Sequence, residues 1–182
     1  MIFTELNLKG AYIIDLKVFS DERGWFGRTY CKEEFNSKGL EQEWVQMNHS
    51  FTKKRGTVRG MHFQFPPYQE IKMVRCIAGT VYDVIVDIRK DSPTFLQHVG
   101  IELSAANKKM IYIPAGFAHG FQTLSDDAEL IYHHSALYAP QAEAGLLHND
   151  PLLNINWPLT VTELSVRDSK HAQIIKETFK GI

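Results

Sequence analysis

Short apolar runs with alternating polar positions dominate this sequence. Runs rich in Val, Ile, Tyr and Phe are separated by Gly, Pro, Asn and Asp, which is the pattern of β-strands joined by tight turns. Ten such runs predict strands over Tyr12–Val18, Phe26–Cys31, Trp44–Phe51, Val58–Gln64, Lys72–Ile77, Thr80–Ile88, His98–Leu103, Lys109–Ile113, His119–Thr123 and Glu129–Ala136. Ten strands in one domain require two packed faces.

The run Val81–Ile88 shows how such faces could meet. Alternation places Asp83 and Asp87 with Val81 and Ile85 on one face, while the opposite face is wholly apolar. The acidic face points either into a polar cavity or to solvent, and both readings fit the pattern. Short, Gly-bearing connections favour antiparallel hairpins over helical crossovers. We therefore predict an all-β fold, an antiparallel double-sheet barrel or jelly roll.

Two segments carry helical signals instead. Lys32–Lys38 is short and polar and is followed by Gly39. Asp168–Phe179 offers Asp168 or Ser169 as an N-cap and repeats apolar residues at helical spacing. The sequence predicts short helices near residues 32–38 and at the C-terminus.

Length and charge narrow the class of protein. With 182 residues and no evident linker, we expect a single domain over residues 1–182. Lys and Arg total 20 against 21 Asp and Glu, so no broad positive field exists to hold nucleic acid or an anionic membrane. No apolar window approaches the roughly 18 residues of a membrane span and no leader is evident. Cys31 and Cys76 are predicted to be reduced thiols. A cytoplasmic location is expected.

Polar residues gather in three of the predicted strands or their approaches. These segments are Arg59–Gln64, Ile113–Phe121 and Ile131–His134. In an ideal strand Arg59 and His62 would lie on opposite faces, unless Gly60 bends or bulges the chain, as glycines within strands often do. Each segment is a candidate wall of a site.

Two of these segments together resemble the signature motifs of the cupin superfamily, whose members are jelly rolls. Gly56-x5-His62-x-Gln64 and Pro114-x-Gly116-x2-His119 follow its order and spacing. Metal-binding cupins have a second His where Gln64 stands and a Glu at a different spacing from Glu70. Two imidazoles and an amide make a poor zinc or iron site, so no metal is expected.

A more specific resemblance covers residues 15–168. It rests on Asp21–Gly24, Val45–Ser50, Val58–Gln64, Lys72–Cys76, Asp87–Phe95, Gly116–Phe121, Asn149–Pro151 and Trp157-Pro158. These segments resemble the dTDP-4-dehydrorhamnose 3,5-epimerase family, which is a metal-free branch of the cupins. The resemblance implies inversion of C3 and C5 in a nucleotide-linked 4-keto-6-deoxyhexose, on the route to activated L-rhamnose, without a cofactor.

The resemblance also implies roles for individual residues. His62 would be the base, Asp168 the carboxylate that orients it, and Tyr132 the opposing proton donor. Lys72 and His119 would face the sugar and its keto oxygen, where a cation or N–H donor favours an enolate. The full set of implied substrate-binding residues is Arg23, Arg28, Gln46, Met47, Asn48, Arg59, Lys72, His119, Tyr138, Glu143 and Arg167.

Several departures keep alternatives open. Arg28 stands where the family usually has Glu, His133 where it has Lys, and Leu147-His148 where it has Arg-Trp or a similar pair. We expect these changes to alter the rim of the pocket. The alternatives are a 3- or 5-mono-epimerase or ketoisomerase of another sugar nucleotide, a non-catalytic sugar-binding cupin, and a metal-dependent cupin oxygenase. The resemblance further implies a homodimer in which Arg23 and Arg28 reach the neighbouring site.

Overall fold

The computed structural model describes residues 1–40, 43–175 and 177–182, and within these ranges the chain forms mainly β-strands. The strands are β1 (Ile2–Glu5), β2 (Tyr12–Asp15), β3 (Val18–Asp21), β4 (Gly24–Gly27), β5 (Gln46–Thr52), β6 (Val58–Gln64), β7 (Lys72–Ala78), β8 (Thr80–Asp87), β9 (His98–Ser104), β10 (Lys109–Ile113), β11 (Phe117–Thr123), β12 (Ala128–His134) and β13 (Glu143–Gly145). The helical segments are α1 (Lys32–Asn36) and a 3-10 turn, η1 (Asp168–Lys170).

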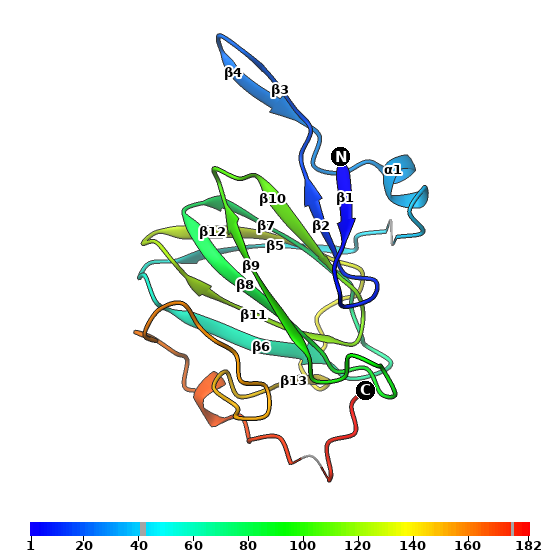
Figure 1. The fold of residues 1–182 in the computed structure, drawn as a ribbon, viewed down its shortest axis with the longest axis vertical. Helices are drawn as coiled ribbons and strands as arrows, with labels where there is room; N and C mark the ends of the chain where they lie inside the picture. The colour runs from blue at the N-terminus through cyan, green and yellow to red at the C-terminus, as the bar shows by residue number, and fades with distance from the viewer. Residues whose placement is uncertain (41–42, 176) are drawn as a thin grey trace.

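Two antiparallel sheets pack face to face and form the body of the molecule (Figure 1). One sheet has the order β1-β2-β10-β7-β12-β5, and the other has the order β13-β6-β11-β8-β9. Strands that are distant in sequence are neighbours in both sheets, as a jelly roll requires. The predicted all-β double-sheet fold is confirmed.

The main core lies between the sheets. Inward-facing apolar side chains of the two sheets, such as Val74 and Leu130 on one and Ile85 and Phe121 on the other, belong to a single buried cluster. Removing such apolar surface from water is the dominant favourable term in folding. The same interior holds the polar site described below.

Each sheet also has a covered outer face. Met61 and Val84, on the outer side of the five-stranded sheet, pack against the C-terminal part of the chain through Leu153, Trp157 and Phe179. On the outer side of the six-stranded sheet, Phe35 of α1 belongs to a cluster with Met73 and Tyr112. Figure 1 shows α1 beside β1 and β2, and the C-terminal segment beneath β6.

The acidic face of β8 points into the protein and not to solvent. Asp83 and Asp87 are fully buried, and so are the apolar residues Val84 and Val86 of the opposite face. The interpretation with a solvent-facing acidic side is therefore wrong, and the reading with carboxylates directed inward is supported. Periodicity could not separate the two, because a buried carboxylate and an exposed one occupy the same alternating position.

Most strand predictions are confirmed within a few residues, and Val58–Gln64 and Lys109–Ile113 match β6 and β10. The predicted strand Phe26–Cys31 is wrong beyond Gly27, because β4 ends there after pairing with β3. The β3–β4 hairpin extends away from the two sheets (Figure 1). Both cysteines are free thiols, as predicted. None of the helices in the described part of the chain is long and apolar enough to cross a membrane.

The predicted N-terminal helix is confirmed as α1, but the predicted C-terminal helix Asp168–Phe179 is wrong. Only η1 is helical in the described part of that segment, and residue 176 lies outside the described residues. Asp150 Oδ2 accepts a hydrogen bond from the backbone N–H of Ile174 at 2.6 Å, and Ile175 is 59% exposed. The apolar residues Ile174 and Phe179 pack individually against the cluster on the outer sheet face. These tertiary contacts override the helical spacing.

Candidate active site

A cavity of about 310 Å³ opens between the two sheets. Its walls are made by side chains of both sheets and of the loops at their ends. The lining residues are Gln46, Asn48, Ser50, Arg59, His62, Phe63, Gln64, Glu70, Lys72, His119, Phe121, Tyr132, His134, Tyr138, Glu143 and Arg167. This size and mixture of apolar and convergent polar groups suit a small organic ligand.

A bulge in β6 brings two of the predicted residues to this cavity. The pairing of β11 with β6 shifts between His119, opposite His62, and Phe121, opposite Arg59. At the shift Gly60 has φ +134°, and a Cβ on Gly60 would lie 2.5 Å from the Cα of Gly120. Two facing glycines thus permit a backbone approach that larger residues would block. The chain is therefore irregular at Gly60, which is the condition under which Arg59 and His62 could share a face, and both line the cavity.

His62 is joined to Asp168, which η1 supplies from beyond the sheet. His62 Nε2 lies 2.8 Å from Asp168 Oδ1, and the Gly60 N–H donates to Asp168 Oδ2 at 3.1 Å. Burial alone would raise the pKa of Asp168, but its hydrogen bond and attraction to His62 hold the pKa well below its usual range. An ionised carboxylate only accepts hydrogen bonds, so Nε2 of His62 carries the proton. Nδ1 then has the lone pair that can take a proton.

Tyr132 belongs to β12, in the sheet opposite to that of His62. Its hydroxyl lies 3.1 Å from Ser50 Oγ, and its ring stacks on His134 with centroids 6.1 Å apart. Burial raises the pKa of Tyr132 above its usual value. The phenol therefore stays protonated at neutral pH and is available as a proton donor.

His119 is held by one of the buried acids of β8. Its Nε2 lies 2.8 Å from Asp83 Oδ2, and both side chains are buried. This pairing explains why β8 has a carboxylate on its inward face. His119, which lines the cavity, is thereby fixed in orientation.

A second buried ionic group was missed by sequence reasoning. Glu70 Oε1 lies 2.9 Å from Lys72 Nζ, and Glu70 Oε2 lies 2.6 Å from His134 Nδ1. His134 Nε2 is also 3.2 Å from Asn48 Nδ2. Burial opposes ionisation of Glu70, but His134 and Lys72 outweigh it and lower its pKa. The available signal was the placement of His134 two residues after Tyr132, on the same strand face.

Four of the predicted substrate contacts meet at the edge of the cavity. Glu143 Oε2 accepts hydrogen bonds from the Tyr138 hydroxyl and from Arg167 Nη1, each at 2.7 Å. Gln46 Oε1 accepts the backbone N–H of Tyr138 at 3.1 Å. These contacts tie the segment before β13 to β5 and to the residue that precedes Asp168.

Three other predicted contacts are not brought to the cavity of this chain. Met47 is 64% exposed, because it points away from Gln46 and Asn48 on β5. Arg23 forms an ion pair with Asp21 in the β3–β4 hairpin. Arg28 lies 3.4 Å from Glu34 of α1.

Two departures from the family pattern also lie outside the cavity, contrary to the expectation that they alter its rim. The ring of His133 packs against Trp44, with centroids 5.8 Å apart. The carbonyl of His148 accepts a hydrogen bond from Trp157 Nε1 at 2.8 Å. Neither side chain lines the cavity.

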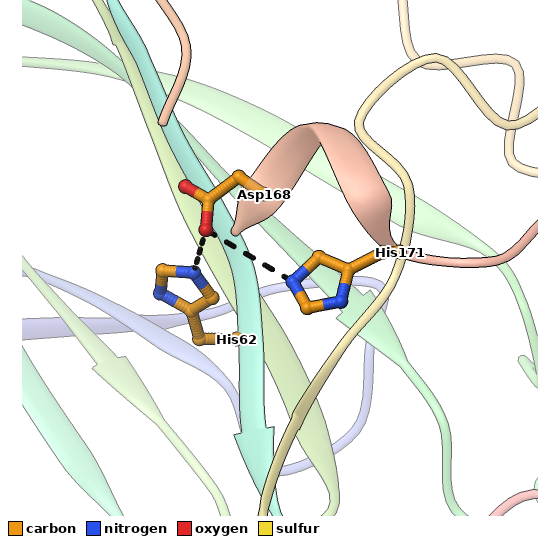
Figure 2. Close-up of side chains that lie close together, drawn as sticks. All are labelled: His62, Asp168 and His171. Atoms are coloured by element: carbon orange, nitrogen blue, oxygen red, sulfur yellow. Dashed lines mark hydrogen bonds and ion pairs between the residues drawn. The ribbon is translucent and has the colours of Figure 1, made fainter. Parts of the chain in front are cut away.

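A third imidazole, His171, lies beside the His62 and Asp168 pair (Figure 2). Its Nε2 is 3.9 Å from Asp168 Oδ1, and the His171 and His62 rings meet edge to face with centroids 6.2 Å apart. Burial lowers the pKa of His171, and the adjacent His62 adds to this effect. These three residues are the group in the described part of the chain whose side chains could share a metal ion.

Taken together, the jelly roll and its cavity define a class of protein. The cavity has a carboxylate-oriented histidine on one side, a protonated tyrosine on the other, and cationic side chains nearby. This arrangement is typical of a cupin that catalyses proton transfer to and from carbon. The sequence profile described as dTDP-4-dehydrorhamnose 3,5-epimerase matches residues 5–176. The chain belongs to the dTDP-4-dehydrorhamnose 3,5-epimerase family.

Individual relatives agree with this assignment. A dTDP-4-dehydrorhamnose 3,5-epimerase of Shigella flexneri is 48% identical over 163 residues, which are 89% of this chain and 90% of the relative. A Legionella pneumophila 3,5-epimerase, solved with dTDP-4-keto-L-rhamnose, has a TM-score of 0.89 and 38% identity, covering 94% of this chain and 92% of its own. A 3'-monoepimerase of Streptomyces bikiniensis, solved with dTDP-quinovose, has a TM-score of 0.87 and 33% identity, covering 92% and 85%.

Proposed function

We propose that the chain is an isomerase that converts dTDP-4-dehydro-6-deoxy-D-glucose to dTDP-4-dehydro-L-rhamnose by inverting C3 and C5 of the sugar. The family assignment supports the substrate class. The observation that carries the mechanism is the placement of the His62–Asp168 pair and the Tyr132 hydroxyl on opposite sides of one cavity. Residues 1–182 act in this proposal as one cupin-type domain.

In the proposed reaction His62 removes the proton from the carbon next to the keto group. The electron pair moves onto the keto oxygen as an enolate facing Lys72 and His119, and the ammonium of Lys72 stabilises its charge. Tyr132 then donates its proton to the opposite face of the carbon, which inverts the centre. Solvent restores the proton of Tyr132 and accepts that of His62. Asp168 keeps His62 in the tautomer that leaves Nδ1 free and balances the imidazolium charge.

The nucleotide contacts are proposed in the same way. Arg59 and Arg167 line the cavity and offer planar guanidinium groups that meet phosphate oxygens two at a time. Gln46, Asn48, Tyr138 and Glu143 complete this wall with hydrogen-bonding groups. Arg167 must release Glu143 or share its donors when a diphosphate enters, because both anions compete for the same guanidinium.

We also propose a homodimer, in which the β3–β4 hairpin of one copy reaches the cavity of the other. The hairpin leaves Phe19, Trp25 and Phe26 between 47% and 74% exposed, and large apolar side chains gathered in this way favour burial against a partner. Such an exchange would give Arg23 and Arg28 the substrate contacts that they do not make within their own chain. Met47 could contact substrate only as part of the same exchange between subunits. The cytoplasmic location stays a prediction.

Proton NMR in deuterium oxide tests the function directly. The protein is incubated with dTDP-4-keto-6-deoxyglucose, and the C3 and C5 proton signals of the sugar are followed before any reductase is added. Loss of both signals, with conversion to the L-rhamno product, supports the 3,5-epimerase. Loss of one signal identifies a mono-epimerase. Loss of neither overturns the proposal, and CDP- and GDP-linked 4-keto sugars then test a changed nucleotide.

Tyr132→Phe separates abstraction from inversion. If Tyr132 is the donor on the opposite face, the variant still exchanges sugar protons with solvent through His62 but forms product at least about a hundredfold more slowly. His62→Ala should lose both exchange and inversion. A non-catalytic sugar-binding cupin would show the same absence of exchange in the wild type as in His62→Ala.

A further inference from the structure

We propose that His62, Asp168 and His171 form a binding site for a divalent transition-metal ion, with Zn²⁺ as the best fit, and that an ion bound there switches off the catalytic base. The site is distinct from a catalytic metal centre, because the proposed reaction uses no metal. Its inhibitory consequence rests on the proposed role of His62, whereas metal binding itself does not.

The ligand atoms are already close together. Asp168 Oδ1 lies 2.8 Å from His62 Nε2 and 3.9 Å from His171 Nε2, and the three atoms lie within 4.8 Å of one another. A tetrahedral zinc ion with bonds of about 2.0–2.2 Å needs ligand atoms about 3.3 Å apart. The two measured separations lie on either side of this value, so the rings must move for all three atoms to coordinate one ion. Figure 2 shows Asp168 placed between the two rings.

The state of His171 is the second observation. Its Nε2 is buried and has no hydrogen-bond partner in the structure. A buried polar atom without a partner is unfavourable, so this nitrogen gains from any ligand that reaches it. The ring is accommodated because residue 145 is glycine, where a Cβ would lie 2.3 Å from His171 Nε2. His171 thus presents a free nitrogen toward an ionised carboxylate and a second imidazole.

The chemistry of the three ligands selects the ion. Two imidazole nitrogens and one carboxylate oxygen suit Zn²⁺ and similar borderline ions, and they are a poor set for Mg²⁺ or Ca²⁺, which prefer oxygen. The fourth position is left for water. His62 lines the cavity and its side chain is 24% exposed, so an ion from solvent can reach the site.

Arg167 is the natural competitor of the ion. Its Nη2 lies 3.2 Å from His62 Nε2 and its Nε lies 3.5 Å from Asp168 Oδ1. Because His62 Nε2 carries a proton toward Asp168, its contact with Arg167 Nη2 brings two N–H groups together. A metal ion at the same position would be repelled by the positive charge of the guanidinium. The Arg167 side chain is 54% exposed and is also paired with Glu143, so it can leave His62 and Asp168 while keeping that ion pair. Metal binding therefore requires displacement of this guanidinium.

Coordination explains the loss of activity. The ion takes the lone pair of His62 Nε2, and the proton formerly on Nε2 moves to Nδ1, so the neutral ring keeps one proton and the total is unchanged. Nδ1 then has no lone pair with which to remove a proton from the sugar. The metal thus converts the base into a ligand.

Calorimetric titration of the chelator-treated full chain with Zn²⁺ alone tests the site. We expect one equivalent to bind, and His171→Asn to weaken binding at least tenfold, because even removal of an outer partner of a metal ligand costs about 10–100-fold. His49→Asn is the matched control, since His49 is an exposed histidine that also pairs with a carboxylate, Glu129. Arg167→Gln should tighten binding. Equal Zn²⁺ affinity of wild type and His171→Asn, or no wild-type binding at millimolar Zn²⁺, overturns the site.

Two further measurements, nitrogen NMR and an inhibition assay, test the site separately from folding. On Zn²⁺ addition, nitrogen NMR should shift Nε2 of His62 and His171, and shifts confined to other histidines would contradict the assignment. Zn²⁺ should inhibit the wild type, with recovery on adding EDTA. Binding at these nitrogens without inhibition would support the metal site but overturn the proposed switch. That outcome would also argue against His62 as the base.

Discussion

Glu70 Oε2 lies 2.6 Å from His134 Nδ1, while the other carboxylate oxygen of Glu70 holds Lys72 at 2.9 Å. One largely buried carboxylate thus connects the ring that stacks on Tyr132 to the ammonium proposed to stabilise the enolate. The proton donor and the cation of the site are positioned by the same acid. This relationship makes Glu70 a positioning residue, although it touches no reacting atom in the proposed mechanism.

Glu70→Gln should lower kcat at least about tenfold with a smaller change in KM. The substitution removes the charge that holds Lys72, and hydrogen bonds to charged groups contribute about 1.5–3 kcal/mol. Steady-state NMR of the epimerisation measures the two constants separately. Glu129→Gln, which breaks an exposed pair with His49, is the control and should stay within about twofold of wild type. Equal loss in both variants would refute the positioning role.

Asp168→Asn should reduce kcat by about 10²–10⁴-fold, the range typical of general acid–base catalysis. The amide keeps the size of the carboxylate but cannot fix the His62 tautomer or balance its charge as an anion does. Because the pKa of Asp168 is held well below its usual range, the wild-type carboxylate stays ionised through mildly acidic pH. Activity within threefold of wild type in the variant would exclude the dyad.

Gly120→Ala should destabilise the fold by about 1–3 kcal/mol or more, as overpacking does. A Cβ there would lie 2.6 Å from Met61 Sδ and 2.7 Å from the Arg59 carbonyl oxygen, at the bulge that sets Arg59 and His62 on one wall. Urea unfolding measures the free energy. Gly27→Ala, whose added Cβ would meet Val18 Cγ1 at 3.1 Å in the projecting hairpin, should cost clearly less. The reverse order would count against the role of this close approach.

Asp87 should contribute to acid sensitivity. Its buried carboxylate accepts hydrogen bonds from Arg89, Ser92 and Thr94. Burial alone would raise the pKa of Asp87, but these donors lower it to about 2. A pKa lower in the folded state than in the unfolded state stabilises the fold above about pH 4, and the benefit disappears as pH falls toward 2.

Urea midpoints for wild type and Asp87→Asn, measured from pH 6 downward, provide the check. The stability gap between the two proteins should narrow by about 2 kcal/mol between pH 5 and pH 2. A gap that is constant across this range would show that the carboxylate does not titrate as proposed.

Arg23→Ala and His62→Ala should complement each other if the hairpin serves the neighbouring subunit. In a mixed dimer one site carries both defects and the other carries neither. Each variant alone should be nearly inactive, and refolding the two together should restore a substantial part of wild-type turnover. Light scattering first establishes the dimer. Mixing without recovery, although mixed dimers form, would place Arg23 in its own site or in none.

Much of the architecture could be predicted from the sequence. Alternation located β6 and β10 at their bounds, because each of these strands has a local pattern bounded by turn residues. The motifs around His62 and His119 indicated the fold and a shared site, and these residues are cross-strand partners in β6 and β11. The His62–Asp168 pairing came from the resemblance, and the 2.8 Å contact between them supports it.

The errors have a common physical origin. The segment after Asp168 has helical spacing, but its apolar residues are satisfied one at a time by the outer sheet face and loops. Propensity is a weak prior that such contacts override. The Glu70–Lys72–His134 group was missed because His134 is distant in sequence from Glu70 and Lys72, and only the pairing of β12 with β7 brings it beside them.

The sequence by itself determined the strand order in the chain, the turn residues and the identity of the reactive side chains, since these depend on neighbours within a few residues. Tertiary structure alone decided which of them meet. It directed Asp83 inward to His119, directed Met47 outward, and placed His171 beside Asp168. The reason is that the partner of a side chain on another strand or segment depends on register and on the bulge at Gly60, which only the assembled fold fixes.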